Sequence, residues 1–154
     1  MRANFCFDFV IAVRDHDASV AKYAALFGIE PIELAPESLP EKAQRCTIFP
    51  LWDQGDRGMV FSVISSSDPG SSINEGIRAR GEGLALFGLD VDDVDAIKAQ
   101  GEAAGVRFQS AEPIAYDYGR MINVRPETTH SVPIFFSTHR SGWWQKSLNG
   151  GRDR

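Results

Sequence analysis

Short runs in which apolar and polar residues alternate recur along the chain, and this two-residue period is typical of β-strands. The first run, "NFCFDFVIAV", is rich in β-branched and aromatic residues. In the next segment, "ASVAKYAALFG", apolar residues recur every three or four positions, which predicts a helix that ends at Gly28. The alternating pattern then returns, and it predicts strands over residues 29–34, 45–51 and 59–65.

The same order of elements begins again at residue 84. A short helix is predicted over residues 73–81, between the two parts. The second part is predicted to contain a strand over residues 84–91, a helix over 92–105, and strands over 106–110, 119–126 and 131–139. Each part is therefore expected to fold as strand, helix and three strands.

The two parts also match in their residues. When Val13 is placed over Val91, Asp15 falls on Asp93. Both aspartates stand where a helix is predicted to begin, a position at which a carboxylate caps free backbone N–H groups. The match in residues and in the order of elements favours an internal duplication.

The duplication predicts an α+β fold. Each part has too few strands to bury both faces of its own sheet, so the two parts must share a core. We expect paired βαβββ modules that form a curved sheet around a cup-shaped ligand cleft. The modules would span residues 5–65 and 84–138 of a single domain, residues 1–140, followed by a C-terminal tail, residues 141–154. The tail contains Trp143 and Trp144, whose docking place the pattern does not indicate.

Composition and charge narrow the function classes. The chain has 154 residues, 43% of them hydrophobic, and a formal net charge of −5 without a cluster of Lys and Arg, so nucleic acid is not an expected partner. No stretch approaches the ~18 apolar residues that span a bilayer. The N-terminal segment has no small-residue cleavage site. We expect a cytoplasmic protein without a membrane partner, in which Cys6 and Cys46 are reduced.

Four segments resemble the vicinal oxygen chelate, or glyoxalase-like, superfamily, and are most similar in pattern to methylmalonyl-CoA epimerases. They are "FDFVIAVRD", "AKYAALFGI", "GEGLALFGLDVDDVDAIKAQGEAAGVRF" and "RPETTHSVPIFF". The resemblance extends to about residue 138 and implies the βαβββ fold. It is also compatible with a homodimer. The superfamily includes lyases, epimerases, dioxygenases and drug-binding proteins, so the fold alone does not define the activity.

In metal-dependent members of that superfamily, four strands each contribute one inward-facing metal ligand. The resemblance places those positions at Asp8, Ser62, Leu86 and Phe135. Leu86 and Phe135 have no donor atom, and a serine hydroxyl is a poor ligand unless ionised. We therefore expect neither a metal nor another cofactor.

Strand alternation predicts which side chains face the cup. Residues 6, 8, 10 and 12 should share one face, with Leu84, Leu86 and Gly88 of the second part, while Phe7 and Phe9 should face the helices. The cup would then be apolar apart from Asp8. A carboxyl group in an apolar cavity has its pKa raised by desolvation, which suits a general acid or base. Alternatively, Asp8 could cap a backbone group or pair with an arginine: Arg45, Arg120 or Arg125.

Two further segments carry candidate site residues. His130 lies on a predicted turn, where its imidazole could shuttle a proton or could simply bond to its own backbone. Tyr116, Tyr118 and Arg120, in "AYDYGRM", precede or begin a strand near the expected mouth of the cup, where they could orient a carbonyl or a ring, or form an ordinary turn. His16 lies among helix-capping residues and is interpreted as structural.

These residues lead to a functional prediction with two alternatives. The prediction is a metal-independent isomerase or lyase that acts on a small carbonyl-containing or aromatic molecule by acid/base proton transfer. Asp8 and His130 would be catalytic, and the substrate would contact Cys6, Ser62, Leu86, Tyr116, Tyr118, Arg120 and Phe135. The first alternative is a non-catalytic protein that sequesters a small molecule, and the second is a metal-dependent acyl-CoA epimerase or glyoxalase-type enzyme.

Overall fold

The structure, a computed structural model, describes residues 1–53, 57–116 and 119–139. The first module consists of β1 (Cys6–Ala12), α1 (His16–Phe27), β2 (Ile32–Glu33), β3 (Gln44–Asp53) and β4 (Gly58–Ser66). Helix α2 (Ser72–Arg80) connects it to the second module, which consists of β5 (Gly83–Asp90), α3 (Val94–Ala103), β6 (Ile114–Tyr116), β7 (Gly119–Asn123) and β8 (Ile134–His139). Two short 3₁₀ helices, η1 (Pro36–Ser38) and η2 (Pro126–Thr128), lie in the loops. The predicted fold class, with two βαβββ modules, is confirmed.

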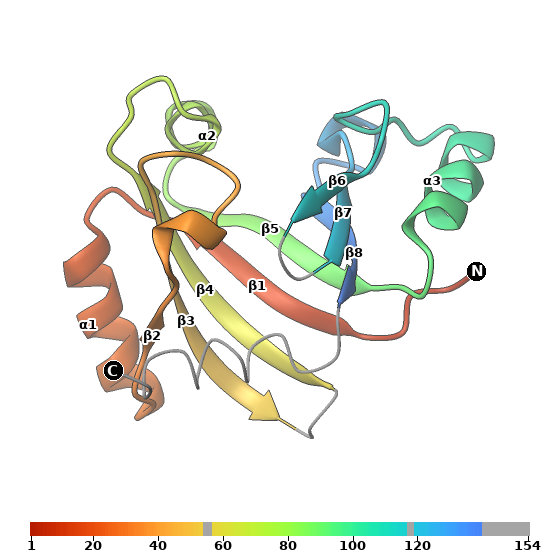
Figure 1. Ribbon diagram of the computed structural model, residues 1–154. Coiled ribbons are helices and arrows are strands. Elements are labelled where there is room, and N and C mark those ends of the chain that lie inside the picture. Colours follow the sequence, from red (N-terminus) through yellow and green to blue (C-terminus); the bar gives the residue numbers. More distant parts are fainter. Residues whose placement is uncertain (54–56, 117–118, 140–154) are drawn as a thin grey trace.

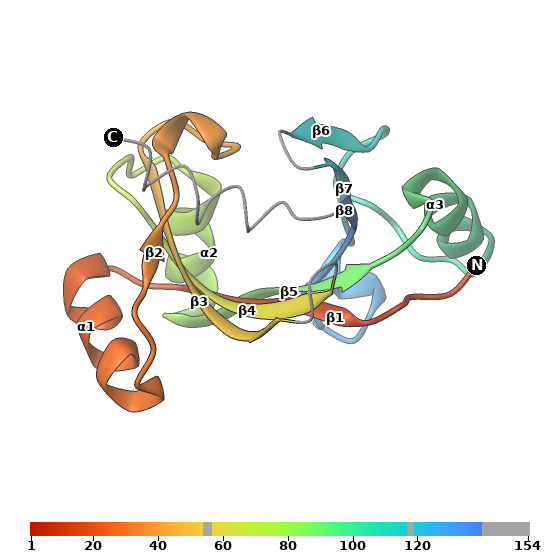
Figure 2. The same ribbon diagram turned by 60° about the horizontal axis from the view of Figure 1, so that its bottom comes forward.

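The two modules join edge to edge in one eight-stranded sheet, in the order β2-β3-β4-β1-β5-β8-β7-β6. Within each module the first and last strands are parallel, β1 with β4 and β5 with β8. The antiparallel pair of β1 and β5 joins the modules. The sheet curls, with α1 and α3 on its outside and η1 and β6 above its concave side (Figures 1 and 2).

Three buried clusters divide the interior. The concave cluster contains Val10, Ile48, Val60 and Phe135, and α2 adds Ile73 and Ile77 to it. On the outside of the sheet, α1 packs against a cluster that includes Phe49 and Val63, and α3 packs against another that includes Ile122 and Val124. Alternate residues of β3, β4 and β7 therefore belong to opposite faces, as the two-residue period predicts.

The helix caps agree with the predicted match of the two modules. The Asp15 side chain accepts a hydrogen bond from the backbone N–H of Ala18 at the start of α1, and the Asp93 side chain accepts one from Ala96 at the start of α3. Gly28 ends α1 in the left-handed conformation, at φ 66°. Equivalent aspartates thus begin both outer helices.

One predicted strand is wrong. Residues 106–110 form only an isolated bridge, between Phe108 and Val124, and the hairpin partner of β7 is the later segment Ile114–Tyr116. The side chain of Phe108 is buried in the cluster beneath α3, and Arg107 O accepts a hydrogen bond from Arg125 N. The apolar residue in "VRFQS" therefore reflects packing under a helix, and strand periodicity does not distinguish these two reasons for burial.

Two register shifts between β1 and β5 also change the predicted faces. Cys6 pairs with Leu89 and Asp8 with Gly88, so Phe7 is an extra residue in β1. Phe7 packs in the concave cluster, edge-on to Phe135 at 5.3 Å between ring centroids, whereas alternation placed it toward the helices.

The second shift lies between Val10 and Ile11. It makes Ala85 the extra residue of β5, and Ala85 packs against the concave cluster. Leu84 is 51% exposed, and it pairs with Ile11, which belongs to the cluster beneath α1. Its predicted place in the cup is therefore wrong, because a bulge resets the alternation.

In the part of the chain that the structure describes, no helix is both long enough and apolar enough to cross a membrane.

Candidate functional site

A row of paired residues crosses the middle of the concave face. Asp8 on β1 pairs with Gly88 on β5, Gly88 with Phe135 on β8, and Phe135 with Asn123 on β7. At Gly88, a Cβ atom would lie 2.5 Å from Cζ of Phe135 and 2.7 Å from Cε1 of Phe7. The two aromatic rings therefore fill the space above Gly88, and both belong to the buried concave cluster.

Asp8 is buried on this face, with 9% of its surface exposed. Ser62 Oγ, on the adjacent strand β4, donates a hydrogen bond of 2.7 Å to Asp8 Oδ1. Burial raises the pKa of Asp8 to about 7, and the hydrogen bond from Ser62 opposes this only in part. The carboxyl group can therefore either accept or donate a proton near neutral pH.

The alternative in which an arginine pairs with Asp8 is wrong. Arg45 binds Glu33 and Asp17, Arg120 binds Asp95, and Arg125 binds Glu127. A neighbouring cation would lower the pKa of Asp8 by favouring the charged form. Among the described residues, the partner of Asp8 is the neutral hydroxyl of Ser62, so no ion pair offsets the charge of the ionised carboxylate there.

The two carboxylate oxygens of Asp8 differ in their hydrogen bonds. Within the described ranges, Oδ1 is the Asp8 side-chain oxygen that accepts a hydrogen bond, and Oδ2 accepts none. The fully buried side-chain oxygens without a partner are Gln44 Oε1 and Asn123 Oδ1, so Asp8 Oδ2 keeps some accessible surface. This oxygen is the atom that a ligand could approach.

Cys46 belongs to the same polar group, although its sequence context indicated only a small buried hydrophobe. It lies in the concave cluster, and burial raises the pKa of its thiol, with the charge of Asp8 acting in the same direction. A thiol so strongly protonated is a poor nucleophile.

A second polar pair lies on the other wall of the concave face. The hydroxyl of Tyr116, on β6, lies 2.5 Å from Ser137 Oγ on β8. Ser137 is fully buried, and its hydroxyl also lies 3.1 Å from the backbone oxygen of Arg120. Burial raises the pKa of Tyr116 to about 12, and the charges of Asp8 and Asp90 act in the same direction. Tyr116 therefore stays protonated, and it lies within the electrostatic influence of Asp8.

The other predicted site residues are not all brought to Asp8. Leu86 packs against the concave cluster and pairs with Val10, so it is part of the apolar wall. Arg120 is exposed and pairs with Asp95 of α3 on the outer face. Cys6 pairs with Leu89, the residue after Gly88. Because of the bulge at Phe7, the side chain of Cys6 points away from the face that carries Asp8.

His130 is exposed on the turn before β8, with a positive φ of 55°. No hydrogen bond or ion pair joins its side chain to Asp8 in the described part of the chain. Tyr118 and the pair Trp143 and Trp144 lie outside the described residues.

The donor set does not fit a metal ion. Of the four positions that hold ligands in metal-dependent relatives, Asp8 and Ser62 are hydrogen-bonded to one another, and Leu86 and Phe135 provide no lone pair. Among the described residues, no group of three or more His, Cys, Asp or Glu side chains gathers to bind an ion.

The structure also has a surface hollow of about 570 Å³ at the end of α3. It is lined by Glu102, residues 105–111 and Arg125, and none of these belongs to the concave cluster. We place the candidate site at Asp8 because its carboxyl group is buried and has a pKa near neutral pH.

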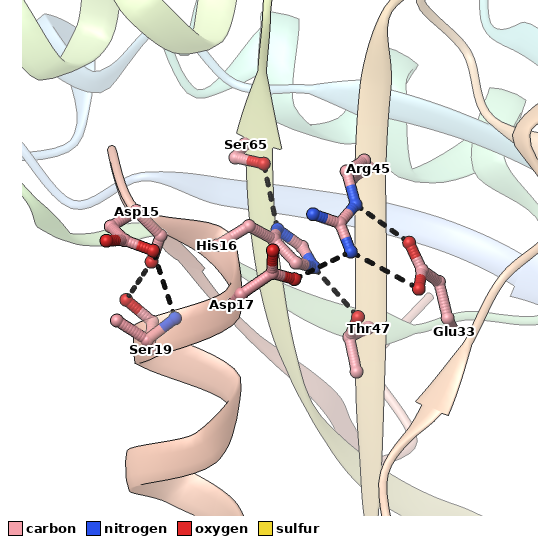
Figure 3. Close-up of polar contacts among 9 residues, drawn as sticks. Asp15, His16, Asp17, Ser19, Glu33, Arg45, Thr47 and Ser65 are labelled. Carbon is pink, nitrogen blue, oxygen red and sulfur yellow. Dashed lines mark hydrogen bonds and ion pairs between the residues drawn. The ribbon is translucent and has the colours of Figure 1, made fainter.

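His16, interpreted from the sequence as structural, is buried on the outer face between β3 and β4 (Figure 3). Its Nδ1 lies 2.8 Å from Ser65 Oγ, and its Nε2 lies 2.8 Å from Thr47 Oγ1. Both ring nitrogens therefore have protein partners, and the residue fastens the start of α1 to the sheet.

Comparison with known proteins gives both a family match and structural matches. The family model for the Glyoxalase/Bleomycin resistance protein/Dioxygenase superfamily matches residues 8–124. A Streptomyces coelicolor methylmalonyl-CoA epimerase variant in complex with 2-nitronate-propionyl-CoA is 25% identical, with a TM-score of 0.78 over 90% of this chain and 96% of that chain.

Two further structures are also similar. A methylmalonyl-CoA epimerase in complex with methylmalonyl-CoA and NH4+ has the same identity of 25%, a TM-score of 0.78 and the same coverage of 90% and 96%. The epimerase from Mycobacterium tuberculosis is 19% identical, with a TM-score of 0.74 over 93% of each chain. No curated protein matches the sequence.

Proposed function

We propose that this chain, which belongs to the Glyoxalase/Bleomycin resistance protein/Dioxygenase superfamily, is a metal-independent isomerase or lyase that moves a proton on a small carbonyl compound. The observation that carries the proposal is the Asp8 carboxyl group: it is buried on the concave face, bonded to one neutral hydroxyl, and has a pKa of about 7. A general base works best when its pKa lies near the working pH.

The proposed step begins with ionised Asp8. Its Oδ2 removes a proton from the carbon next to the substrate carbonyl, and the electron pair of the broken C–H bond moves onto the carbonyl oxygen as an enolate. Return of the proton from Asp8 to a different carbon gives an isomer; inversion at the same carbon needs a proton from water on the opposite face, while Asp8 releases its own proton to water. Loss of a leaving group from the enolate gives a lyase product. Ser62 holds Oδ1, so that Oδ2 is presented to the substrate.

Hydrogen–deuterium exchange tests this proton transfer without knowledge of the final product. The protein is incubated in D2O with methylmalonyl-CoA, which one of the similar structures contains, and with small ketones and hydroxy ketones. Mass spectrometry then measures deuterium at the carbon next to the carbonyl. We expect incorporation with at least one compound and a loss of about 100-fold in Asp8→Asn, with binding retained.

Two outcomes would count against this function. If Asp8→Asn exchanged at the parent rate, Asp8 would not be the base. If dialysis against a chelator removed the exchange and a divalent metal restored it, the metal-dependent alternative would replace the proposal. Ser62→Ala is the matched control: it keeps the carboxyl group but frees Oδ1, and we expect a smaller loss of about tenfold.

A second candidate function is the sequestration of a small molecule without turnover. The observation in its favour is the apolar character of the second module, where Leu86 and Phe135 stand at two of the four positions that carry ligands in metal-dependent relatives. This candidate predicts ligand binding without deuterium incorporation for every compound tested. Asp8→Asn would then bind as tightly as the parent, or more tightly if the ligand is apolar.

A further inference from the structure

The outer face of the sheet has an apolar strip along β1 and β5. Phe9 on β1 pairs with Phe87 on β5, and their rings stack with centroids 6.5 Å apart. Phe9 is 38% exposed, and Phe87 is half-buried. Among the described residues, the clusters beneath α1 and α3 include neither ring. The two helices lie on either side of these central strands, so the aromatic pair is left partly open to solvent between them (Figures 1 and 2).

The strip joins the buried layers on its two sides. Phe9 also pairs with Phe61, which packs beneath α1. Phe87 also pairs with Ile134, which packs beneath α3. Leu84, on β5, is 51% exposed and pairs with a residue of the cluster beneath α1. A continuous apolar row therefore crosses the outer face, and its middle is the part that the two helices leave exposed.

The strip is uncharged and nearly symmetric. The acidic residues of β1 and β5 are Asp8, which is buried on the concave face, and Asp90, at the end of β5, and neither strand contains Lys or Arg. The residue match between the two modules also places Phe9 over Phe87. The aromatic pair therefore stands at equivalent positions on both sides of the junction, and the strip has approximate twofold symmetry about it.

The size of the strip bears on what can cover it. Strands β1 and β5 have seven and eight residues, so the strip is about 25 Å long at about 3.3 Å per residue. From β4 to β8 it crosses four strands, about 15–20 Å at about 4.8 Å per strand. A projected area of about 400 Å² matches the largest apolar patches on monomers, which are often binding sites. With the bordering sides of α1 and α3, the strip can approach the about 800 Å² that each partner contributes to a standard interface.

We propose that the strip is an interface between two copies of this chain, packed back to back with Phe9 and Phe87 at its centre. A twofold dimer brings the same patch of each copy together, so the patch must be complementary to itself. An uncharged, nearly symmetric strip meets that condition, because two facing copies bring no like charges together. Aromatic residues at the centre of an interface contribute much of the binding energy. This inference goes beyond the proposed function, because it does not depend on the chemistry of Asp8.

Sedimentation velocity of the full chain over a range of concentrations tests the interface. Because the strip is smaller than a standard interface, we expect a dimer with a Kd of about 1–10 µM. Phe9→Ser and Phe87→Ser should each raise the Kd about tenfold or more, since each removes an aromatic ring from the centre of the contact. Ile114→Ser is the matched control: Ile114 is 47% exposed but lies on β6, above the concave side, and its loss should leave the Kd unchanged.

Three results would overturn the interface. The full chain could remain monomeric at about 100 µM, well above the expected Kd, and the strip would then be covered by another part of this chain or by a different protein. The dimer could survive Phe9→Ser or Phe87→Ser with its Kd unchanged, so that the pair would not lie at its centre. Ile114→Ser could weaken the dimer as much as Phe9→Ser does. Far-ultraviolet circular dichroism confirms that each variant is folded, which the partial exposure of both rings favours.

Discussion

Asp8 and His16 are both buried and ionisable, and they lie on opposite faces of the same sheet. Asp8 faces the concave side with one hydrogen bond, from Ser62. His16 faces α1 and has a hydroxyl partner for each ring nitrogen, Ser65 and Thr47. Burial disfavours the charged form of both groups, so it raises the pKa of the carboxyl group and lowers the pKa of the imidazole.

The difference between them is in how completely the polar atoms are satisfied. His16 is neutral and uses both nitrogens within the fold, so the site is closed to a ligand (Figure 3). Asp8 keeps one oxygen without a partner in the described part of the chain. Buried polar groups that are fully bonded serve structure, whereas a partly bonded group lowers stability and is available for chemistry. Burial alone therefore does not identify a functional residue; the unused hydrogen-bonding capacity does.

The largest expected effect is the loss of stability in His16→Ala. The substitution leaves the hydroxyl groups of Ser65 and Thr47 buried without the imidazole, and each unsatisfied group costs about 1–3 kcal/mol. We expect the free energy of unfolding to fall by about 3 kcal/mol, as measured by urea denaturation at pH 8. The deuterium exchange attributed to Asp8 should be unchanged in the folded variant.

A triple variant shows whether the lost stability comes from those hydroxyl groups. His16→Leu combined with Thr47→Val and Ser65→Ala replaces the whole group by apolar side chains, which can be nearly neutral for stability. We expect it to recover at least half of the loss. A triple variant as unstable as His16→Ala would show that packing, and not hydrogen bonding, accounts for the role of His16.

The next largest effect is a gain of stability in Asp8→Asn. The folded-state pKa of Asp8 is about 7, above its ordinary value of 3.8, so the folded protein holds this proton more tightly than the unfolded chain. The protonated carboxyl group therefore stabilises the folded state fully at pH values below 3.8, the pKa in the unfolded chain. This stabilisation is lost as the pH rises through about 7. At pH 8, Asp8→Asn should therefore be more stable than the parent by about 2 kcal/mol.

The pH dependence provides the control for this prediction. Between pH 8 and pH 5, the advantage of Asp8→Asn should shrink, because the parent takes up its proton over that range. The pKa of His16 is lowered from its ordinary value of 6.5, so His16 affects the pH dependence with the opposite sign. Its contribution to stability is complete above pH 6.5 and is lost as the pH falls below that value. Asp8→Asn keeps this contribution, so it cancels when the variant is compared with the parent. An advantage that stays constant from pH 8 to pH 5 would contradict the raised pKa of Asp8.

The sequence predicts the fold well because local patterns determine most of it. Alternation identifies most of the strands, and Asp15 and Asp93 mark the starts of the two outer helices. Alternation fails at Phe7 and Ala85, because a bulge inserts one residue and depends on the pairing with the neighbouring strand. That pairing is formed by β1 and β5, which are far apart in the sequence, so no local pattern reports it.

The candidate site is predicted only in part, for a related reason. Asp8 stands out in the sequence because it is a charged residue inside an apolar strand. The partner of Asp8 is not predicted: an arginine was one alternative, whereas the folded chain uses Arg45 and Arg120 on the outer face with Glu33, Asp17 and Asp95.

The smallest expected effect concerns Arg45. Its charge is the second-largest cause of the lowered pKa of His16, after burial. Arg45 is 41% exposed and pairs with Glu33 at 2.8 Å and Asp17 at 3.0 Å, so Arg45→Met should cost only about 0.5 kcal/mol of stability. Without this cation, the carboxylates of Glu33 and Asp17 would act on the imidazole unopposed and raise its pKa.

An NMR titration of the His16 ring in Arg45→Met measures that rise directly. Arg14→Met is the matched control, because Arg14 is also exposed and pairs with a distant carboxylate, Glu82. We expect the pKa of His16 to rise in Arg45→Met and to stay at the parent value in Arg14→Met. If both variants left it unchanged, burial would determine the pKa of His16, and burial is also the largest influence on the pKa of Asp8. The two sites would then differ only in whether the polar atoms of the side chain all have hydrogen-bond partners.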